Sequence, residues 1–368
     1  MVEYKALKDI ATIVMGQSPD SSSYNEEKNG IPFYQGNADF GELYPTARVW
    51  CSKPKKIAKE NDILISVRAP IGALNYAAEE CCIGRGLAAI TIEDDFERNY
   101  VFHFLKAQNK ELNNKGTGST FKAISKSVLE DLQVPIIGKK EQEIIMNMMD
   151  IIEEIIRQRK QELQKYEDLI KARFVEMFGT IHDNKFEYDI CTIQSVCEQI
   201  KDGTHQTPEY TDDIINGFKF LSSKDVTSGK INWDGIKYIP ECLHNNLYKR
   251  IAPRKGDILL AKNGTTGVAA IVDVDEIFDI YVSLALLRPI EMNSIYLCAA
   301  INSQETKEQF NRSLKGIGVP NLHLGEIKKT KILNPPIKMQ NEFANFVAQV
   351  DKSKLTLCRY NVMEYKCE

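Results

Sequence analysis

The sequence predicts an α+β fold, in which two similar mixed domains follow one another and are separated and followed by long helices that pair as an antiparallel coiled coil. Three observations predict it. A set of motifs occurs twice in the same order, short apolar runs rich in β-branched residues occur in both copies, and a stretch without proline or glycine lies between them. The repeat is far longer than the roughly 20–50 residues of solenoids and propellers, so it indicates a duplicated domain.

The first copy, residues 1–138, is predicted to be a mixed domain. Residues 62–67 and 86–92 are short apolar runs rich in Ile, Leu and Val, which predicts strands. Residues 100–108 have the apolar spacing of a helix. The glycines among residues 115–119 predict a flexible loop.

The second copy, residues 180–337, repeats this order of elements. Strands are predicted over residues 257–261 and 281–287, and a helix over residues 295–301. The framework motifs repeat while the loops between them differ. Two related domains with different loops suit a target that also has two different halves.

Residues 139–179, between the copies, are predicted to form one long helix that serves as a spacer. No proline or glycine occurs from Lys140 to Phe178, and Gly179 supplies the stop. Apolar residues alternate by four and three positions, which is typical of a coiled-coil seam. The seam residues predicted to pair are Ile145, Met149, Ile152, Ile156, Leu163, Tyr166, Ile170 and Met177.

The predicted partner of this helix is a second, shortened helix over residues 338–368. It begins after a Pro-Pro-Ile sequence, at the place that matches the start of the first helix. Its predicted pairing residues are Phe343, Phe346, Val347 and Val350. The alternative is that the two helices are unrelated and that each covers its own domain.

Composition restricts the class of protein. The chain has 368 residues and a formal net charge of −4, which argues against binding a polyanion by bulk charge. Its nine cysteines form no CxxC pair, and the five histidines lack ligand spacing to them, so we expect reduced thiols in the cytoplasm and no metal site. No signal pattern opens the chain, and no apolar run approaches the ~20 residues of a membrane span, so no membrane association is expected.

Motifs for catalysis are missing. The sequence contains neither a GxxxxGK[ST] phosphate loop nor a GxGxxG after a predicted strand. The run Asn334-Pro335-Pro336-Ile337 resembles the Asn-Pro-Pro-aromatic signature of amino-methyltransferases, but Ile replaces the aromatic residue, so a helix-entry turn is the preferred interpretation. The sequence therefore predicts no catalytic residue in this chain.

Local positive charge is the feature that points to a ligand. Lys and Arg neutralise phosphates, and Arg, Lys, Asn and Gln can also bind base edges in the major groove of DNA. Such residues cluster on predicted loops at equivalent places in both copies. The candidate DNA contacts are Arg48, Lys53, Lys55, Lys56, Lys59, Arg68, Lys115, Lys122, Lys126, Lys249, Arg250, Arg254, Lys255, Lys262, Asn263, Arg312 and Lys315.

The whole pattern resembles the specificity subunits of type I restriction-modification systems. The resemblance is carried by the run Asn-Asp-Ile-Leu-Ile-Ser from Asn61, by its counterpart Gly-Asp-Ile-Leu-Leu-Ala from Gly256, and by the sequence from Lys122 to Pro135 after the glycine-rich loop. It implies two target-recognition domains that each bind one half of a bipartite site in double-stranded DNA. It also implies that the helices set the spacing between the halves.

The same resemblance implies the partners of the chain. Two methyltransferase subunits would dock on the helices, and a motor-nuclease subunit would join outside them. S-adenosylmethionine would bind to the methyltransferase subunits, with no cofactor in this chain. Two alternatives stay open from the residues alone: a self-contained DNA adenine methyltransferase or nuclease, and a coiled-coil scaffold that binds other proteins.

Overall fold

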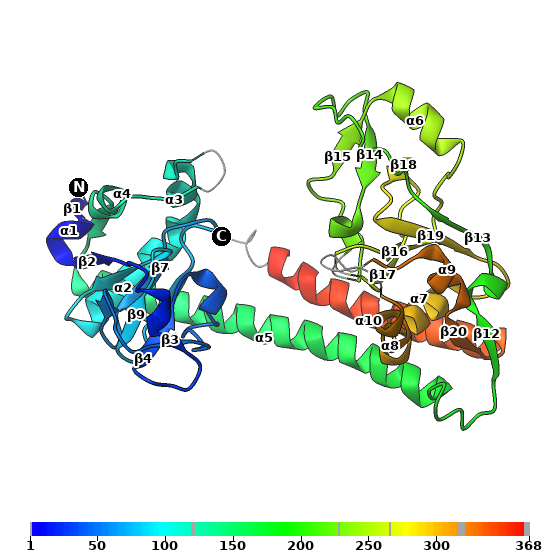
Figure 1. Ribbon diagram of the computed structural model, residues 1–368, viewed down its shortest axis with the longest axis horizontal. Helices are drawn as coiled ribbons and strands as arrows, with labels where there is room; N and C mark the ends of the chain where they lie inside the picture. The colour runs from blue at the N-terminus through cyan, green and yellow to red at the C-terminus, as the bar shows by residue number, and fades with distance from the viewer. Residues whose placement is uncertain (1, 119–121, 227–228, 265, 315–320, 364–368) are drawn as a thin grey trace. The chain divides into compact units, whose positions relative to one another are not determined.

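The computed structural model describes residues 2–118, 122–226, 229–264, 266–314 and 321–363 (Figure 1). The chain divides into two compact units, Met1–Gln158 and Arg159–Glu368. Each unit combines helices with mostly antiparallel sheets, so the predicted α+β class with two similar domains in tandem is confirmed. The division falls within the helix α5 (Lys139–Phe178), and the predicted domain boundaries stay predictions.

The first unit is built around a four-stranded antiparallel sheet with the strand order β2-β10-β7-β8. A second sheet, called the smaller sheet because most of its strands are shorter, has five strands in the order β3-β5-β4-β9-β6. In addition, β1 pairs with β11. The strands are β1 (Glu3–Ala6), β2 (Thr12–Met15), β3 (Tyr24–Asn25), β4 (Ile31–Tyr34), β5 (Trp50–Cys51), β6 (Ile57–Ala58), β7 (Ile63–Ser66), β8 (Leu74–Tyr76), β9 (Cys81–Ile83), β10 (Leu87–Thr91) and β11 (Gln133–Ile136). The helices are α1 (Leu7–Ile10), α2 (Asp95–Ala107), α3 (Asn109–Lys115) and α4 (Lys126–Glu130).

The central sheet of this unit is buried on both faces. Successive side chains of a strand point to opposite faces, so Ile63 and Ile65 of β7 join the core that includes Leu105 of α2. Leu64, between them, joins a separate core with Tyr34 of β4. Two cores on one sheet explain why β7 and β10 are continuous apolar runs without polar alternation.

The second unit repeats this topology. Its four-stranded antiparallel sheet has the order β13-β19-β16-β17, its smaller sheet the order β15-β14-β18, and β12 pairs with β20. The strands are β12 (Asp189–Thr192), β13 (Cys197–Asp202), β14 (Phe218–Leu221), β15 (Lys237–Ile239), β16 (Ile258–Ala261), β17 (Ala269–Ile271), β18 (Phe278–Ile280), β19 (Leu284–Pro289) and β20 (Lys331–Asn334). The helices are α6 (Glu241–Tyr248), α7 (Ser294–Asn302), α8 (Gln304–Ser313), α9 (Leu324–Lys329) and α10 (Ile337–Met363).

The same division into two cores recurs here. Ile258 and Leu260 of β16 pack in one core with Tyr296 of α7, whereas Leu259 packs on the other face with Phe278 of β18. The strand β16 therefore occupies the place of β7, and the helices α7, α8 and α9 follow in the place of α2, α3 and α4. The internal repeat in the sequence is a repeat of this layered arrangement.

Most predicted elements lie where the sequence placed them, with two differences. Helix α2 begins at Asp95, earlier than the predicted residue 100, because the Asp94 carboxylate accepts a hydrogen bond from Glu97 N at 2.9 Å and caps an additional turn. Strand β19 begins at Leu284 rather than at residue 281, since Leu284 N donates to Tyr281 O at 2.9 Å in a turn.

The loop predicted over residues 115–119 is joined to the chain beyond it. Thr117 N donates to Ala123 O at 3.0 Å, and Ala123 N donates to Thr117 O at 2.9 Å. Residue 119 lies outside the described residues, so the prediction of a flexible loop stays a prediction.

Helix α5 is one unbroken helix over Lys139–Phe178 (Figure 1). It ends where predicted: Gly179 has a φ of +70° and donates its N–H to Val175 O at 2.8 Å. A positive φ is the backbone conformation that only glycine adopts without strain, so Gly179 is a terminator of the helix.

The C-terminal part of α5 packs against α10 within the second unit. The ring of Phe343 of α10 lies edge-on to Phe174 and Phe178, with ring centroids 5.5 and 5.6 Å apart. Lys354 Nζ of α10 also lies 2.7 Å from a carboxylate oxygen of Glu167. Both helices therefore supply one side of the core of this unit.

Several residues predicted to pair lie in this contact. Ile170 and Met177 of α5 belong to the core with Phe343 and Val347, while Val350 is buried. The ring of Phe346 lies 5.8 Å from the guanidinium carbon of Arg173. Tyr166 is half-buried, and Leu163 is exposed. The prediction omitted Phe174 and Phe178, the two aromatic residues that contact α10 most directly.

The N-terminal part of α5, in the first unit, carries an exposed apolar face. Met146 packs into the core of that unit, and Glu153 accepts a 2.6 Å hydrogen bond from Lys106 Nζ of α2. Eight apolar side chains here are 37–60% exposed, and we name them the α5 apolar face: Ile144, Ile145, Met148, Met149, Ile151, Ile152, Ile155 and Ile156. Four of them, Ile145, Met149, Ile152 and Ile156, were predicted to pair with the second helix.

The contact between α5 and α10 generates a test of stability. Phe178→Ala should lower the free energy of unfolding of the second unit by about 3–5 kcal/mol, because a fully buried aromatic ring is replaced by a cavity. Trp233 is the reporter of this unit, so urea unfolding is followed by its fluorescence in a Trp50→Phe background. Leu169→Ala, on the 47% exposed side of the same helix, is the control and should change the stability by less than about 0.5 kcal/mol. Equal losses in the two variants would contradict this packing.

Candidate nucleic-acid interface

An open groove lies on the first unit beside the smaller sheet. It has a volume of about 690 Å³, and its lining includes Tyr24, Phe33, Gln35 and Asn37. The rings of Tyr24 and Phe33 stack with centroids 4.7 Å apart. We name this cavity the first-unit groove. Phe33 is buried, so the half-buried ring of Tyr24 and the amide side chains are the groups that can contact the flat bases and polar edges of a nucleic acid.

The lining of the first-unit groove also includes three arginines, Arg48, Arg68 and Arg85, and two acids, Glu26 and Asp39. Arg48 is held by Asp39, with its Nε 3.2 Å from a carboxylate oxygen. Arg68 and Arg85 are exposed, and within the described part of the chain neither forms an ion pair. Two guanidinium groups without acidic partners are therefore available to a ligand in this groove.

The turn that presents Arg85 is closely packed. Arg85 stands between Gly84 and Gly86, and a Cβ atom at Gly86 would lie 2.4 Å from the carbonyl oxygen of Gln35. Gly84 is also close, since its Cβ would lie 3.0 Å from the Cα of Gln35. Only glycine allows this approach, so the backbone around Arg85 is fixed against β4 while its side chain projects from the turn.

Backbone hydrogen bonds identify the position that corresponds to Arg85 in the second unit. Gly84 N donates to a carbonyl oxygen at the end of β4 at 2.8 Å, and Tyr281 N donates to a carbonyl oxygen at the end of β14 at 2.8 Å. The residues that follow these two donors occupy equivalent places. Arg85 therefore corresponds to Val282.

The other two arginines also have counterparts without charge. Arg68 and Asn263 each form an isolated β-bridge two residues after the equivalent strands β7 and β16. Phe33 N of β4 donates to Val49 O, and Arg48 is the residue before Val49. In the second unit Phe220 of β14 pairs with Lys237, and Ile236 is the residue before Lys237. Because the same scaffold folds with Asn263 and Ile236 there, the fold does not require arginine at either position.

An aromatic pair is common to both units. Arginines line the cavity around it in the first unit, and a lysine contacts it in the second. Tyr210 and Phe220 correspond to Tyr24 and Phe33, and their ring centroids are 6.2 Å apart. Lys237 Nζ lies 4.0 Å from the centroid of the Tyr210 ring, which is within the range of a cation–π contact. The two units therefore keep an aromatic pair at this place, stacked in the first unit and edge-on in the second, and vary the polar groups around it.

The second unit holds a charged cluster where the first unit is apolar. Lys262 Nζ is buried and lies 3.0 Å from a carboxylate oxygen of Asp202. His205 Nε2 lies 3.2 Å from the same oxygen, and Arg250 3.4 Å from the other. Burial alone would raise the pKa of Asp202, but the hydrogen bond and charge of Lys262 outweigh it and hold the pKa below its usual range.

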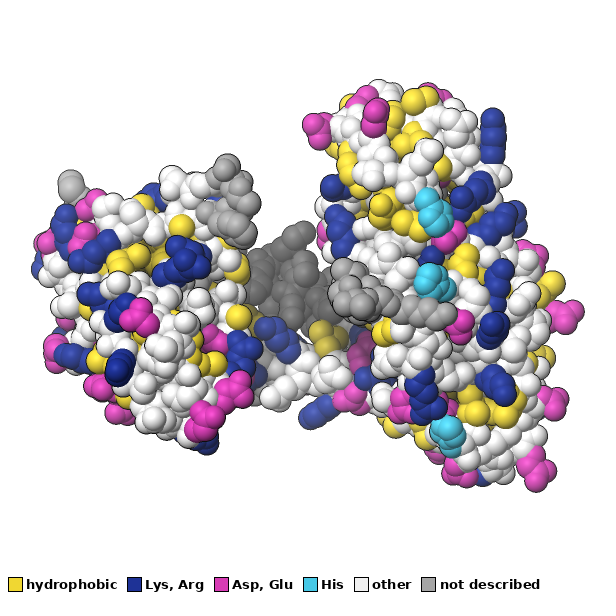
Figure 2. All heavy atoms as spheres, viewed as in Figure 1, with side chains coloured by type: hydrophobic (Ala, Val, Ile, Leu, Met, Phe, Trp, Pro, Cys, Tyr) yellow, Lys and Arg dark blue, Asp and Glu magenta, His cyan; other side chains and the backbone are white. Residues whose placement is uncertain are grey.

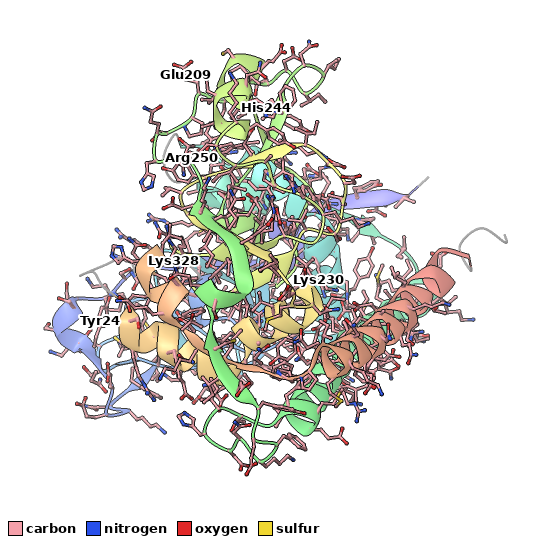
Figure 3. All side chains as sticks on the ribbon, turned by 90° about the vertical axis from the view of Figure 1, so that its right-hand side faces the viewer. Tyr24, Glu209, Lys230, His244, Arg250 and Lys328 are labelled. Carbon is pink, nitrogen blue, oxygen red and sulfur yellow. The ribbon has the colours of Figure 1, made fainter. Side chains whose placement is uncertain are left out.

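A second buried pair fixes helix α6 on the smaller sheet of this unit. His244 Nδ1 lies 2.7 Å from Asp279 of β18, and the His244 ring stacks on Phe218 at 3.7 Å. Burial raises the pKa of Asp279, although the hydrogen bond from His244 opposes that shift. Figure 3 labels His244 on α6 and Arg250 after it. The pair is enclosed, so we assign it to the support of α6 rather than to a ligand.

The Asp residues of the repeated motif are also part of the scaffold. Asp62 accepts a hydrogen bond from Lys59 N at 2.8 Å, and Asp257 accepts one from Arg254 N at the same distance. Asp62 and Asp257 are 4% and 2% exposed. The motif that reveals the repeat in the sequence therefore holds the turn before the central strand and does not face a ligand.

The structure places the predicted DNA contacts in different environments. Those that are exposed and form no ion pair within the described ranges are Lys53, Lys56, Lys59, Arg68, Lys122, Lys249, Arg254 and Lys255. Those that form ion pairs are Arg48, Lys55, Lys115, Lys126, Arg250, Lys262 and Arg312. Asn263 is half-buried, and Lys315 lies outside the described residues.

Lys262 differs most from its predicted role, since its ammonium group faces Asp202 and not solvent. Conversely, the prediction omitted Arg85, Gln35 and Asn37 of the first-unit groove. The one signal for Arg85 in the sequence is its position between two glycines. Figure 2 shows Lys and Arg side chains interspersed with Asp and Glu on the face that it draws, so local groups rather than bulk charge define the candidate interface.

No group of three or more His, Cys, Asp or Glu side chains among the described residues could hold a metal ion. Among the helices described, none combines the length and apolar composition that crossing a membrane requires.

Comparison with protein families gives a match to nearly the whole chain. Residues 1–165 and 187–361 both match the model of the type I restriction modification DNA specificity domain. The two matched stretches correspond to the two copies of the duplicated fold.

Two curated relatives come from Methanocaldococcus jannaschii. The putative type I restriction enzyme MjaX specificity subunit is 42% identical over 156 residues, which are 42% of this chain and 37% of that protein. The type I restriction enzyme MjaVIII specificity subunit is 21% identical over 374 residues, 95% of this chain and 86% of that protein. This chain thus matches well under half of the length of the MjaX subunit.

Two solved structures are also similar. The HsdS subunit from Thermoanaerobacter tengcongensis is 43% identical over 44% of this chain and 39% of that one, with a TM-score of 0.40. The S subunit of a type I restriction-modification system from M. genitalium is 15% identical over 98% of this chain and 92% of that one, with a TM-score of 0.48.

The pairing of Asp202 with Lys262 can be tested by giving both positions the residues of the first unit. Asp202 and Lys262 occupy the places of Met15 and Val67. Asp202→Met alone should cost about 3–5 kcal/mol, because it leaves the buried Lys262 ammonium without its main partner. The double variant Asp202→Met/Lys262→Val should recover most of that loss. Urea unfolding followed by Trp233 fluorescence measures both, and a double variant as unstable as Asp202→Met would contradict the assigned pairing.

The same variants give a pH dependence of defined sign. The folded pKa of Asp202 lies below its unfolded value, so its contribution to stability is complete above about pH 4 and is lost as the pH falls through the folded value. The wild-type chain should therefore lose stability relative to the double variant on acidification.

Proposed function

We propose that this chain, which belongs to the family of type I restriction-modification DNA specificity proteins, is the subunit that recognises DNA sequence in such a system. Each unit would bind one half of a bipartite site in double-stranded DNA. The chain would select the site and leave the chemistry to its partners. S-adenosylmethionine would then bind to a methyltransferase subunit and not to this chain.

One observation carries this proposal: a single scaffold occurs twice and presents different side chains at equivalent places. Arg48, Arg68 and Arg85 line the groove of the first unit, whereas the second unit has uncharged residues at all three places. A duplicated enzyme would be expected to repeat its reactive groups. A pair of sequence readers instead needs the same frame with different contacts.

Exposed lysines on both units support binding to a duplex. Lys53, Lys56 and Lys59 lie in one stretch of the first unit, and Lys249 and Lys255 lie near Arg254 in the second. Lysine ammonium groups are point charges that suit phosphates. Because the net charge is −4, we propose that the methyltransferase subunits supply part of the phosphate contact.

Helix α5 supports the proposed assembly. The α5 apolar face consists of eight large, exposed apolar side chains. Apolar surface of this kind marks interaction sites in soluble proteins. We assign the face to methyltransferase subunits, two for each chain, with a motor-nuclease subunit joining outside them. We further assign to α5 the role of setting the number of base pairs between the half-sites, since it is one unbroken helix.

Exchange of residues 1–138 tests the proposed reading of half-sites. Replacing them by the corresponding domain of another family member should change one half of the methylated motif and leave the other half and the spacer unchanged. Methylation mapping by long-read sequencing of cells that carry the exchanged chain provides the measurement. An unchanged motif in an active complex would overturn the assignment.

A charge introduced into the α5 apolar face tests the docking of methyltransferase subunits. Met148→Glu/Ile151→Glu places two carboxylates at side chains that are 58% and 60% exposed, so the fold should be retained while apolar contact is lost. We expect the amount of co-purified methyltransferase to fall at least about tenfold, since each buried unpaired charge costs several kcal/mol.

Asn147→Glu is the matched control, because Asn147 is exposed in the same turn of the helix and the change adds the same charged group. Native mass spectrometry counts the subunits, and circular dichroism checks the helix content. Equal recovery of methyltransferase with the double variant and with the control would contradict docking at this face.

A further inference from the structure

The first-unit groove holds more specific chemistry than a general affinity for DNA. Its two free guanidinium groups, Arg68 and Arg85, line one cavity together with the amides of Gln35 and Asn37. We propose that Arg68 and Arg85 recognise guanine, so that the half-site of the first unit contains at least one G·C pair contacted in the major groove. This inference rests on the proposed function and adds the identity of a base to it.

The guanidinium groups of Arg68 and Arg85 are both available to a ligand. In the same groove, Arg48 is held by Asp39, which shows that an arginine there can be satisfied within the chain. Arg68 and Arg85 have no such acid among the residues that the structure describes. An exposed arginine without a carboxylate keeps its fork of N–H donors free for a ligand.

The fold does not need these arginines. The equivalent positions in the second unit are Asn263 and Val282, on a scaffold with the same strand order and the same hydrogen bonds around the turn. Neither side chain can replace a guanidinium group in charge or shape. The needs of the fold therefore do not explain the two arginines, and both are open to a role in ligand binding.

The backbone that presents Arg85 is held in a fixed position. The turn that carries it is packed so closely on β4 that a Cβ atom at Gly86 would meet the Gln35 carbonyl at 2.4 Å. A rigid backbone limits where the guanidinium can reach. Such pre-organisation favours recognition of one geometry, whereas a phosphate contact requires only a charge.

Guanine is the base that fits this group. Arginine donates two parallel hydrogen bonds to O6 and N7 of guanine, and this is the commonest base-specific contact in protein–DNA complexes. A phosphate is the competing ligand for an arginine. The lysines at positions 53, 56 and 59 of the same unit are exposed and suit phosphates, while the arginines share their cavity with carboxamides, which also bind base edges.

The test uses the complex of the full chain with its methyltransferase and a duplex that carries the mapped motif. Each guanine of the first half-site is replaced in turn by 7-deazaguanine, which lacks the N7 acceptor. We expect at least one replacement to weaken binding by the wild-type complex by about tenfold. The same replacement should have almost no effect on the complex with Arg85→Ala, or on the complex with Arg68→Ala, whichever variant lacks the arginine that contacts this N7.

Arg85→Lys separates base recognition from charge. It keeps the positive charge but lacks the planar fork, so it should reduce the effect of 7-deazaguanine while the salt dependence of binding stays at the wild-type slope. Lys110→Ala, an exposed cation of the same unit outside the groove, is the control and should keep the full effect of 7-deazaguanine. Thermal unfolding and recovery of the methyltransferase verify that each variant is folded.

The inference is overturned if the first half-site contains no G·C pair, if no 7-deazaguanine weakens wild-type binding, or if both alanine variants keep the whole effect. These results are distinct from failure of the proposed function. Exchange of residues 1–138 would still change half of the motif if the unit reads DNA by other residues, and it would change nothing if the unit reads no DNA.

Discussion

Burial of the central sheet on both faces is the constraint on which the rest of each unit depends. Alternate side chains of β7 and β16 enter two different cores, so a shift of register by one residue would exchange the contents of both. The buried carboxylates of Asp62 and Asp257 hold the turn that sets this register. Because burial on both faces restricts the middle of the sheet, differences between the units collect at the strand ends and in the turns and loops around it.

The contrast between a shared central sheet and differing turns explains how one scaffold can recognise two different half-sites. The turn between β9 and β10 carries Arg85, and the equivalent turn between β18 and β19 carries Val282, yet the hydrogen bonds that hold the two turns correspond. Similarly, the apolar place of Val67 in the first unit is filled by the paired Lys262 in the second. Side chains change at these places while the backbone is maintained, which is the property that exchangeable specificity requires.

The sequence predicted the framework well and the candidate site only in part. Continuous apolar runs predicted the central strands because two-sided burial leaves no polar alternation, and the absence of Pro and Gly predicted α5. Heptad counting missed Phe174 and Phe178, since a globular core rather than a strict seam receives this end of the helix. Charge clustering found Arg68 but missed Arg85, which stands alone in the sequence and joins the groove only through the fold. It also included Lys262, whose burial beside Asp202 depends on a contact between distant strands.

The most direct test of the central claim is to map DNA methylation across the genome of the source cell with and without this chain. Two readers on one duplicated scaffold predict a motif of two specified parts separated by unspecified base pairs, present with the chain and lost without it. A methylation pattern that does not change when the chain is removed, or a lost motif that forms a single uninterrupted block, would contradict the account.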